Sequence, residues 1–222
     1  EVLMATADQV SKVAHSSIQK KGSGSIPTDR LLKGEWEVRE CDLSEARRLT
    51  RLYHYSKGGS NTACYTLGLF RRTAFMEQSP IYGITWWIPP TKTAGGSVNR
   101  GNPQGVLSLS RLVCVPTAPK NSCSFMLRHS MRFIDRHRWP SLVTYADEWQ
   151  GHEGTIYKAL ESAGWRFDGY TKPERTYVKD GVMMSRKRGP KTFTHAEMLS
   201  LGFECVGKFR RKRFVHHIGK AA

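Results

Sequence analysis

The chain has 222 residues and a formal net charge of +16, because 35 Lys and Arg face only 19 Asp and Glu. Its apolar fraction of 39% is typical of a globular domain and argues against a disordered chain. No apolar run approaches the roughly 20 residues of a membrane helix, and residues 1–33 lack the order of a secretory signal. We therefore expect one cytoplasmic domain with ragged ends and no membrane contact.

The positive charge is unevenly distributed along the chain. Residues 1–40 are neutral, residues 41–165 carry a net +7 and residues 166–222 carry a net +9. A folded body with this excess is typical of a surface that neutralises phosphates, so nucleic acid is the expected partner. A basic but merely soluble protein is the alternative. The five cysteines show neither zinc-ligand spacing nor an even disulfide framework, which predicts free thiols and a reducing compartment. His54, His152 and Glu153 are the alternative metal ligands, but no spacing supports them, so no metal is expected.

The N-terminal part predicts an arm and then an amphipathic helix. Residues 1–33 mix Ser, Gly, Lys and Gln, which is typical of a flexible arm. From Leu43 to about residue 56, apolar residues recur at helical spacing. Asp42 fits the N-cap of this helix, and Glu45 three residues later predicts a capping box.

The remaining elements follow from apolar periodicity and from Gly and Pro punctuation. Strands are expected at residues 34–39, 63–70, 81–88, 106–115, 141–147, 176–183 and 203–215, with residues 165–170 leading out to the strand at 176–183. Further helices are expected at residues 124–138, 154–163 and 195–201. Residues 91–105 hold four Gly, two Asn and one Pro and predict a long loop, which in a compact domain is usually functional.

This order of elements predicts an α/β (α+β) fold in a single domain. Strands alternate with helices in the second half, which implies parallel pairing there, whereas the opening strands favour antiparallel pairing. We therefore expect a mixed central sheet, antiparallel first and then parallel, with helices on its flanks. Residues 34–185 are assigned to the main domain and residues 186–222 to a basic C-terminal extension.

The junction after the strand at 106–115 is a candidate anion site. A strand that ends in a turn of small residues and opens into a helix presents unpaired backbone N–H groups, which suit a pyrophosphate. Many such junctions bind nothing, so the spacing alone leaves both possibilities open. If the site is real, the residues expected to contact the ligand are Val113, Cys114, Val115, Lys120, Asn121, Ser122 and Ser124.

The element order, the central strand and this turn resemble the acetyltransferase (GNAT) superfamily, which binds acetyl-coenzyme A. The turn of that superfamily carries a basic residue or Gln, then Gly, then Gly or Ala at fixed spacing. Here Pro119 stands in the basic position, and Ser122 and Ser124 stand in the small-residue positions. The resemblance implies acetyl-coenzyme A as the cofactor and residues 34–185 as the catalytic domain.

A closer resemblance is to the Mom proteins, which are phage enzymes that modify adenine in viral DNA. It is carried by residues 109–118, by Val-Thr-Tyr-Ala-Asp at 143–147 and by Gly-His-Glu-Gly-Thr-Ile-Tyr at 151–157. It spans roughly residues 36–180. It implies double-stranded DNA as the partner and attachment of an acetamido (carbamoylmethyl) group to N6 of adenine, which protects DNA from restriction.

Asp147 and Tyr157 are the first candidates for proton transfer. Asp147 ends a strand at the edge where ligands bind in such sheets. The adenine amino group is a poor nucleophile and needs a base, for which Asp147 is the first choice. Tyr157 resembles the superfamily Tyr that protonates the leaving thiolate, although it falls about one helical turn early. The structural alternatives are Asp147 as a helix cap and Tyr157 as a core residue.

Arg111 is a third candidate. Simple alternation puts it on the same strand face as Leu109 and Val113, so it is expected to point into apolar company and to need a carboxylate. Asp147 or Glu148 is the expected partner in a structural ion pair. The alternative is that Arg111 holds a carboxyl or amide of the transferred group.

Aromatic residues supply candidates for base contact. Tyr53, His54 and Tyr55 close the first helix, where the resemblance places the acceptor pocket. His54 is a candidate catalytic residue, and the two Tyr rings are candidates for stacking on a flipped-out base. Core and surface roles are the alternative. Trp86 and Trp87 lie on opposite strand faces, and Trp87 is a further stacking candidate.

The basic run at residues 209–214 is the candidate for backbone contact, with Lys212 and Arg213 expected to bind DNA phosphates. A solvated tail is the alternative. Two other functions also fit the sequence: an ordinary N-acetyltransferase that acts on protein or RNA amines, and a DNA-binding module without activity. The first predicts little effect of removing the basic run, and the second predicts indifference to Asp147→Ala.

Overall fold

The computed structural model describes residues 30–60, 62–72, 79–188 and 191–218. Residues 1–29, which make up most of the predicted arm, lie outside the described residues. No helix of the described part is long and apolar enough to cross a membrane.

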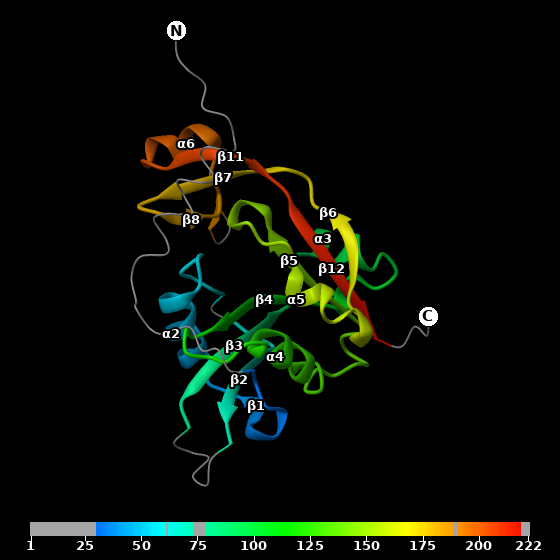
Figure 1. Cartoon of the computed structure of the whole chain (residues 1–222). Helices are drawn as coiled ribbons and strands as arrows, with labels where there is room; N and C mark the ends of the chain where they lie inside the picture. The colour runs from blue at the N-terminus through cyan, green and yellow to red at the C-terminus, as the bar shows by residue number, and fades with distance from the viewer. Residues whose placement is uncertain (1–29, 61, 73–78, 189–190, 219–222) are drawn as a thin grey trace.

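A seven-stranded mixed sheet forms the centre of the fold (Figure 1), in the order β1-β2-β3-β4-β5-β12-β6. Among the described strands of this sheet, β4 and β5 form the one parallel pair, and the other neighbours are antiparallel. The predicted mixed sheet is therefore confirmed, but parallel pairing is rarer than expected. The strands are β1 Trp36–Glu40, β2 Tyr65–Arg71, β3 Ile81–Ile88, β4 Val106–Cys114, β5 Ser141–Asp147, β6 Arg166–Tyr170 and β12 Arg211–His217.

Two helices, α2 and α4, cover opposite faces of the first strands (Figure 1). The helix α2 (Leu43–Tyr53) packs Ala46 and Leu49 against Ile84 and Trp86, which face it from β3. The helix α4 (Ser122–Ser130) packs Phe125 and Met126 against Leu67 and Leu69 of β2. Alternate residues of the strands thus serve the two faces, which is the reason for their near-continuous apolar runs.

The predicted helix boundaries need correction. The helix α4 ends at Ser130 rather than near residue 138 and continues in turns. At the start of α2, Asp42 occupies the N-cap position but its side chain makes no capping hydrogen bond. Glu45 bonds Arg48 instead, at 2.9 Å, so the predicted capping box is absent.

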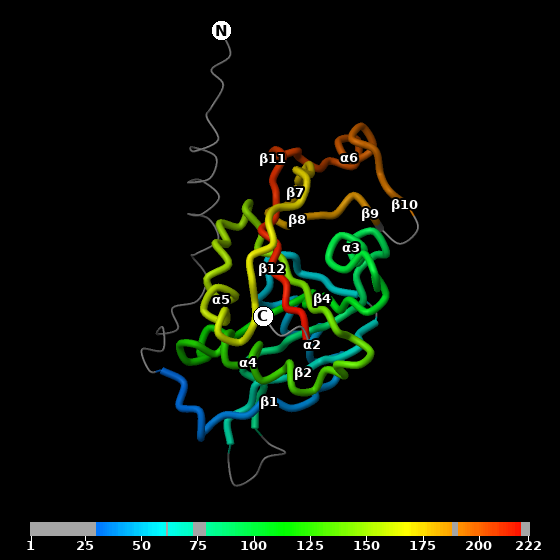
Figure 2. Tube along the Cα trace, turned by 90° about the vertical axis from the view of Figure 1, so that its right-hand side faces the viewer, coloured from blue at the N-terminus to red at the C-terminus, as the bar shows by residue number. Residues whose placement is uncertain are grey.

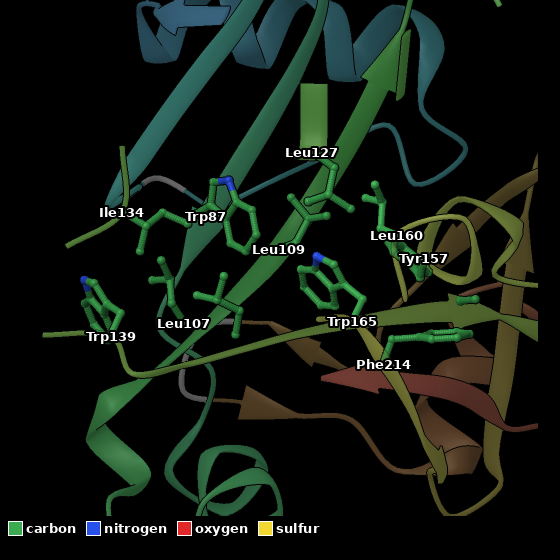
Figure 3. Packing of buried hydrophobic residues seen from close by; sticks show 12 residues of the cluster. Trp87, Leu107, Leu109, Leu127, Ile134, Trp139, Tyr157, Leu160, Trp165 and Phe214 are labelled. Carbon is green, nitrogen blue, oxygen red and sulfur yellow. The ribbon is translucent and has the colours of Figure 1, made fainter. Parts of the chain in front are cut away.

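The largest core lies on the α4 face under β4 and β5 (Figure 3). Trp87, Leu107 and Leu109 meet Leu127 there, and Trp165 joins them from the C-terminal half. The expected helix at 154–163 consists of two pieces, α5 (Thr155–Lys158) and the 3-10 turn η5 (Glu161–Ala163). These pieces seat Tyr157 and Leu160 on this core, close to Phe214 of β12.

Residues 91–105 are not the long loop that their composition predicts. They form α3 (Lys92–Val98) and the 3-10 turn η3 (Pro103–Gly105). Thr91 caps α3 by accepting a hydrogen bond from the Ala94 N–H. Gly95 lies where a Cβ atom would collide with the Pro103 carbonyl, so the helix tolerates glycine because the following turn packs tightly against it.

A smaller, three-stranded sheet follows β6 (Figure 1). Its order is β11 (Glu204–Phe209), β7 (Glu174–Lys179) and β8 (Val182–Met184). The helix α6 (His195–Ser200), with a true capping box between Thr194 and Glu197, covers it. The short elements are η1 (Lys33–Glu35), η4 (Glu148–Gln150), β9 (Lys187–Arg188) and β10 (Lys191–Thr192).

The predicted C-terminal extension is wrong as a structural unit. The single strand expected at 203–215 is two strands in two sheets, because β11 ends at Phe209 and β12 begins at Arg211. The strand β12 lies between β5 and β6 in the main sheet, and Phe214 is 1% exposed. The residues after 186 therefore complete the domain rather than extend from it.

Candidate active site

The strands β4 and β5 separate after three residue pairs. Pairing runs from Val106–Ser141 to Ser108–Val143 and then stops. On the other side of β4, Trp86 lies opposite Arg111 while Trp87 lies opposite Leu109, so Ser110 is an extra residue in the strand. Such a β-bulge bends the strand that carries it. The bulge thus coincides with the place where β4 leaves β5.

A cavity of 470 Å³ lies in this gap. Its walls come from β4 and β5, from α5 and the turn before it, and from the segment after α2. We call it the cleft cavity. Its lining includes His54, Tyr55, Leu109, Ser110, Leu112, Thr144, Tyr145, His152, Glu153 and Tyr157.

Three of the aromatic rings that line the cleft cavity contact one another. The rings of His54 and Tyr55 stack with centroids 4.2 Å apart and planes 28° apart. The ring of His152 meets Tyr55 edge-on at 5.6 Å. Burial, with a smaller contribution from the Asp147 carboxylate, raises the pKa of Tyr55 to about 12, so its phenol stays neutral. The cleft cavity is thus bordered by flat, uncharged rings.

His54 is a hydrogen-bond donor toward the cleft cavity. Its Nδ1 accepts the backbone N–H of Ser56 at 3.2 Å. Burial lowers the pKa of His54 to about 3, and the nearby Arg111 adds to the effect. The hydroxyl of Ser56 is 2.9 Å from the same Nδ1 and can donate to it or accept from it. The Ser56 N–H favours the tautomer with its proton on Nε2.

Asp147 lies behind the cleft cavity rather than in its lining. It is 5% exposed, and its Oδ1 accepts the Trp149 N–H at 3.2 Å, which caps η4. Its Oδ2 is 3.6 Å from Nε of Arg211. Both the helix-cap alternative and an ion pair are therefore present, although the partner is Arg211 and not Arg111.

The pKa of His152 depends on its burial and on the nearby Asp147 carboxylate. Burial lowers the pKa of His152, and the Asp147 carboxylate opposes this shift by favouring the imidazolium. At neutral pH the ring is neutral and able to accept a proton. The sequence did not predict this role for His152, because nothing in a single sequence shows whether Asp147 or His152 faces the ligand.

Tyr157 lines the cleft cavity and contacts the core. Its hydroxyl accepts a hydrogen bond from Oγ1 of Thr144 at 3.1 Å, which leaves the phenolic proton free. Burial raises the pKa of Tyr157, so this proton is retained at neutral pH. The arrangement suits a proton donor. Thr144 was not predicted, since its role depends on the pairing of β5 with α5.

Arg111 does not bind a carboxylate, contrary to the sequence expectation. Its Nε donates to the Gly58 carbonyl at 2.8 Å, and its NH1 donates to the Ser110 carbonyl at 2.6 Å. The bulge at Ser110 moves Arg111 to the α2 face of the sheet, away from Leu109. Arg111 therefore holds the segment that carries His54 and Tyr55.

Two aromatic candidates lie outside the cleft cavity. Trp87 does face the side of the sheet opposite to Trp86, as expected, but it is 0% exposed in the core, so its predicted stacking on a base is wrong. Tyr53 ends α2 with 45% exposure and does not line the cavity. Of the three candidates for stacking on a base, Tyr53, Tyr55 and Trp87, Tyr55 is the one that lines the cleft cavity.

The two candidate phosphate contacts are engaged within the chain. Lys212 forms an ion pair with Glu153 of the cleft cavity, and Arg213 forms one with Asp168 at 2.7 Å. Their side chains are 15% and 19% exposed. They stabilise the junction of β12 with α5 and β6, and neither belongs to a solvated tail.

The predicted anion turn has the expected geometry but different contact atoms. Val113 is buried, the Cys114 and Cys123 sulfurs are 3.2 Å apart, and the Ser122 and Ser124 hydroxyls donate to backbone carbonyls. Beyond Ser108, however, the edge of β4 that faced β5 has no strand partner. The N–H groups of Cys123 and Ser124 open α4 without a backbone partner among the described residues.

The turn therefore fits an extended anionic cofactor through backbone atoms. Lys120 and Asn121 are exposed beside the N-terminus of α4, where Asn121 adopts a φ of 71°. Val115 contributes less, since its N–H donates to the Tyr82 carbonyl. Within the described residues, no group of three or more His, Cys, Asp and Glu side chains is arranged to hold a metal ion.

Structures similar to this chain include several acetyltransferases. A GCN5-related N-acetyltransferase from Kribbella flavida has 11% identity and a TM-score of 0.48, covering 84% of this chain and 100% of its own. An N-acetyltransferase from Staphylococcus aureus has 10% identity and a TM-score of 0.45, with 82% and 98% covered. A Bacillus subtilis acetyltransferase in complex with CoA has 8% identity and a TM-score of 0.41, with 83% and 98% covered.

The sequence comparisons point to one family. No curated protein sequence matches the chain. The Mom protein family matches residues 35–214, a range that begins just before β1 and ends within β12. The match therefore includes every residue that lines the cleft cavity.

Proposed function

Because the chain belongs to the Mom protein family, we propose that it modifies adenine in double-stranded DNA by attaching an acetamido group to N6. Such a change removes the recognition pattern that restriction enzymes read, and so protects the DNA. The observation that carries the proposal is the cleft cavity, in which uncharged rings stand beside groups that accept and donate protons.

The cleft cavity suits a flipped-out base. N6 of adenine is hydrogen-bonded inside a duplex, so an enzyme must extrude the nucleotide to reach it. The stacked pair of His54 and Tyr55 and the edge of His152 offer a planar, apolar wall for the ring. The Nε2–H of His54 is a donor for a ring nitrogen of adenine, which presents acceptors on that edge.

His152 is the group that takes the N6 proton. The adenine amino group loses a proton as its new bond forms, and a neutral imidazole accepts it well near neutral pH. Asp147 favours the resulting imidazolium from behind the cavity, since its carboxylate raises the pKa of His152. Asp147 therefore positions and stabilises the base, and His152 replaces it in the role that the sequence suggested.

Tyr157 is the proton donor to the leaving group. Its phenol is neutral, and because its oxygen accepts from Thr144, its own proton is available to a ligand in the cavity. Arg111 acts at a distance from the reacting atoms by fixing the Gly58 carbonyl, and with it the loop that carries His54 and Tyr55.

Acetyl-coenzyme A is the donor that the site fits best. The free edge of β4 and the N–H groups of Cys123 and Ser124 would hold it, and Lys120 would face its phosphates. When bound, it would supply a two-carbon unit as a thioester. Acyl transfer from it to N6 would give the N-acetyl product and release coenzyme A as the thiol that Tyr157 protonates. An acetamido group joined through its methyl carbon would need, in addition, a nitrogen donor and a two-electron oxidant as co-reactants.

Acceptor competition tests the proposal. The purified protein is incubated with acetyl-coenzyme A labelled in its acetyl group and with equal amounts of duplex DNA, RNA and a lysine-rich peptide. We expect label in DNA, dependent on His152. Label in the peptide or the RNA would identify an ordinary amine acetyltransferase, and a protein that labels none of them would contradict acetyl-coenzyme A as the donor.

A further inference from the structure

A second cavity, of 450 Å³, lies on the small three-stranded sheet. Its lining comes from β7, from β8 and the segment after it, and from β11 and the start of β12. We call it the basic cavity. Its charged residues are Arg175, Arg186, Lys187, Lys208, Arg211 and one carboxylate, Glu174. In both Figure 1 and Figure 2 the small sheet stands at the end of the molecule opposite to α4.

The small sheet does not need these cations for its own packing. Its apolar residues Tyr177, Met198 and Phe203 form a separate core cluster beneath α6. In the pairing of β7 with β11, however, Arg175 lies directly opposite Lys208. Like charges at directly opposed positions destabilise a sheet. The pairing therefore costs stability in the free protein.

The cations of the basic cavity are mostly unneutralised. Among the described residues, no carboxylate oxygen lies within 4.0 Å of the side-chain nitrogens of Arg175, Lys187 or Lys208. The one lining carboxylate, Glu174, is 3.8 Å from Arg211. These three free cations are exposed, so an anion from solution can reach them.

The basic cavity is connected to the candidate active site through Arg211. This residue lines the basic cavity, and its Nε is 3.6 Å from Oδ2 of Asp147. Arg211 also pairs with Asp147 in the register of β12 and β5. Next to it, Arg210 lies over the Tyr170 ring at 4.6 Å. A polyanion in the basic cavity would thus contact Arg211, which also pairs with Asp147 behind the cleft cavity.

We propose that the basic cavity binds the phosphate backbone of the duplex beside the target adenine. The inference rests on the proposed function and adds to it the surface that holds the DNA. Cations from three separate segments suit a run of phosphates better than a single small anion. This surface replaces Lys212 and Arg213, which are paired within the chain, as the main backbone contact.

The test measures how tightly the variant Arg175→Gln/Lys208→Gln binds duplex DNA. Fluorescence anisotropy gives the affinity at a range of salt concentrations. Each lost phosphate contact is expected to reduce the slope of log affinity against log salt by about 1, so by about 2 in all. Affinity at low salt is expected to fall by about tenfold or more. The control Arg128→Gln/Arg132→Gln removes the same charge from exposed positions on and after α4 and is expected to keep the wild-type slope.

The outcomes separate the inference from the proposed function. If the wild type binds and modifies DNA but both double variants behave alike, the basic cavity is not the contact, although the function stands. If the wild type does not bind the duplex, the proposed function itself fails. Thermal melting checks the fold, and the melting temperature of Arg175→Gln/Lys208→Gln is expected to stay level or rise, because a repulsive pair is gone. Lys187→Gln, from a separate segment, is expected to lose a slope of about 1.

Discussion

Acidification should destabilise the protein through His54. In the folded chain, burial and the nearby Arg111 lower the pKa of His54 from 6.5 to about 3. The folded state thus favours the neutral ring, while the unfolded chain protonates it near 6.5. The stabilisation is complete above pH 6.5 and is lost as the pH falls from 6.5 towards 3.

The size of the effect follows from the two pKa values. At pH 5 the unfolded chain has gained a proton on this residue and the folded chain has not, which costs about 2 kcal/mol of folding free energy relative to pH 7.5. His129, His152 and His216, whose pKa values partial burial also lowers, add to the total loss, so the wild type alone does not isolate His54. The variant His54→Asn does, because its side-chain oxygen can still accept the Ser56 N–H that Nδ1 accepts now.

Urea unfolding at pH 7.5 and pH 5.0 measures the difference. The wild type should lose about 2 kcal/mol more stability than His54→Asn between the two values. Losses that agree within about 0.5 kcal/mol would refute the neutral, donating His54 on which the base-binding role depends.

Three further substitutions test the site. Gly154→Ala should lower the free energy of unfolding by about 1–3 kcal/mol, because Gly154 has a φ of +72° and a Cβ there would collide with the Phe214 ring. Chemical denaturation measures this free energy, and an unchanged value would contradict the packing of Gly154 against Phe214. Arg111→Lys should raise KM for DNA more than it lowers kcat, since one ammonium cannot reproduce the bonds to the Gly58 and Ser110 carbonyls. Steady-state kinetics decide, and a pure kcat loss would instead place the guanidinium at the reacting atoms. Tyr157→Phe should keep the fold and lower kcat by about 100-fold or more, and wild-type turnover would remove it from proton transfer.

The strands were predictable because they carry dense apolar and aromatic runs. The bounds of β3 and β5 match the expectation to the residue, and the two tryptophans do face opposite sides of β3. What alternation cannot show is an inserted residue. The bulge at Ser110 shifts every later side chain of β4 to the other face, which is why Arg111 meets Gly58 and not a carboxylate.

The end of the chain was the least predictable part. A basic run with aromatic ends looks like a tail, but Phe214 and Val215 of β12 are buried by partners far away in the sequence, with Phe214 against Tyr157. The charges of Lys212 and Arg213 are satisfied by Glu153 and Asp168, and such pairings exist only after folding. The position of β12 between β5 and β6 is set by these long-range contacts.

Some residues of the candidate site were likewise predictable from the sequence, and others were not. Tyr55, His54 and Tyr157 were identified from the sequence and lie together in the cleft cavity. The exchange of roles between Asp147 and His152 was not predictable, because it depends on which group the turn at η4 directs into the cavity. Asp147 is held back by its bond to the Trp149 N–H.

The most direct test of adenine modification is the mass of nucleosides from plasmid DNA in cells that express the wild type or His152→Asn. We expect a deoxyadenosine heavier by an acetamido group in wild-type cells, and a loss of about 100-fold or more in the variant. Unmodified DNA from cells with folded wild-type protein would contradict the proposed function.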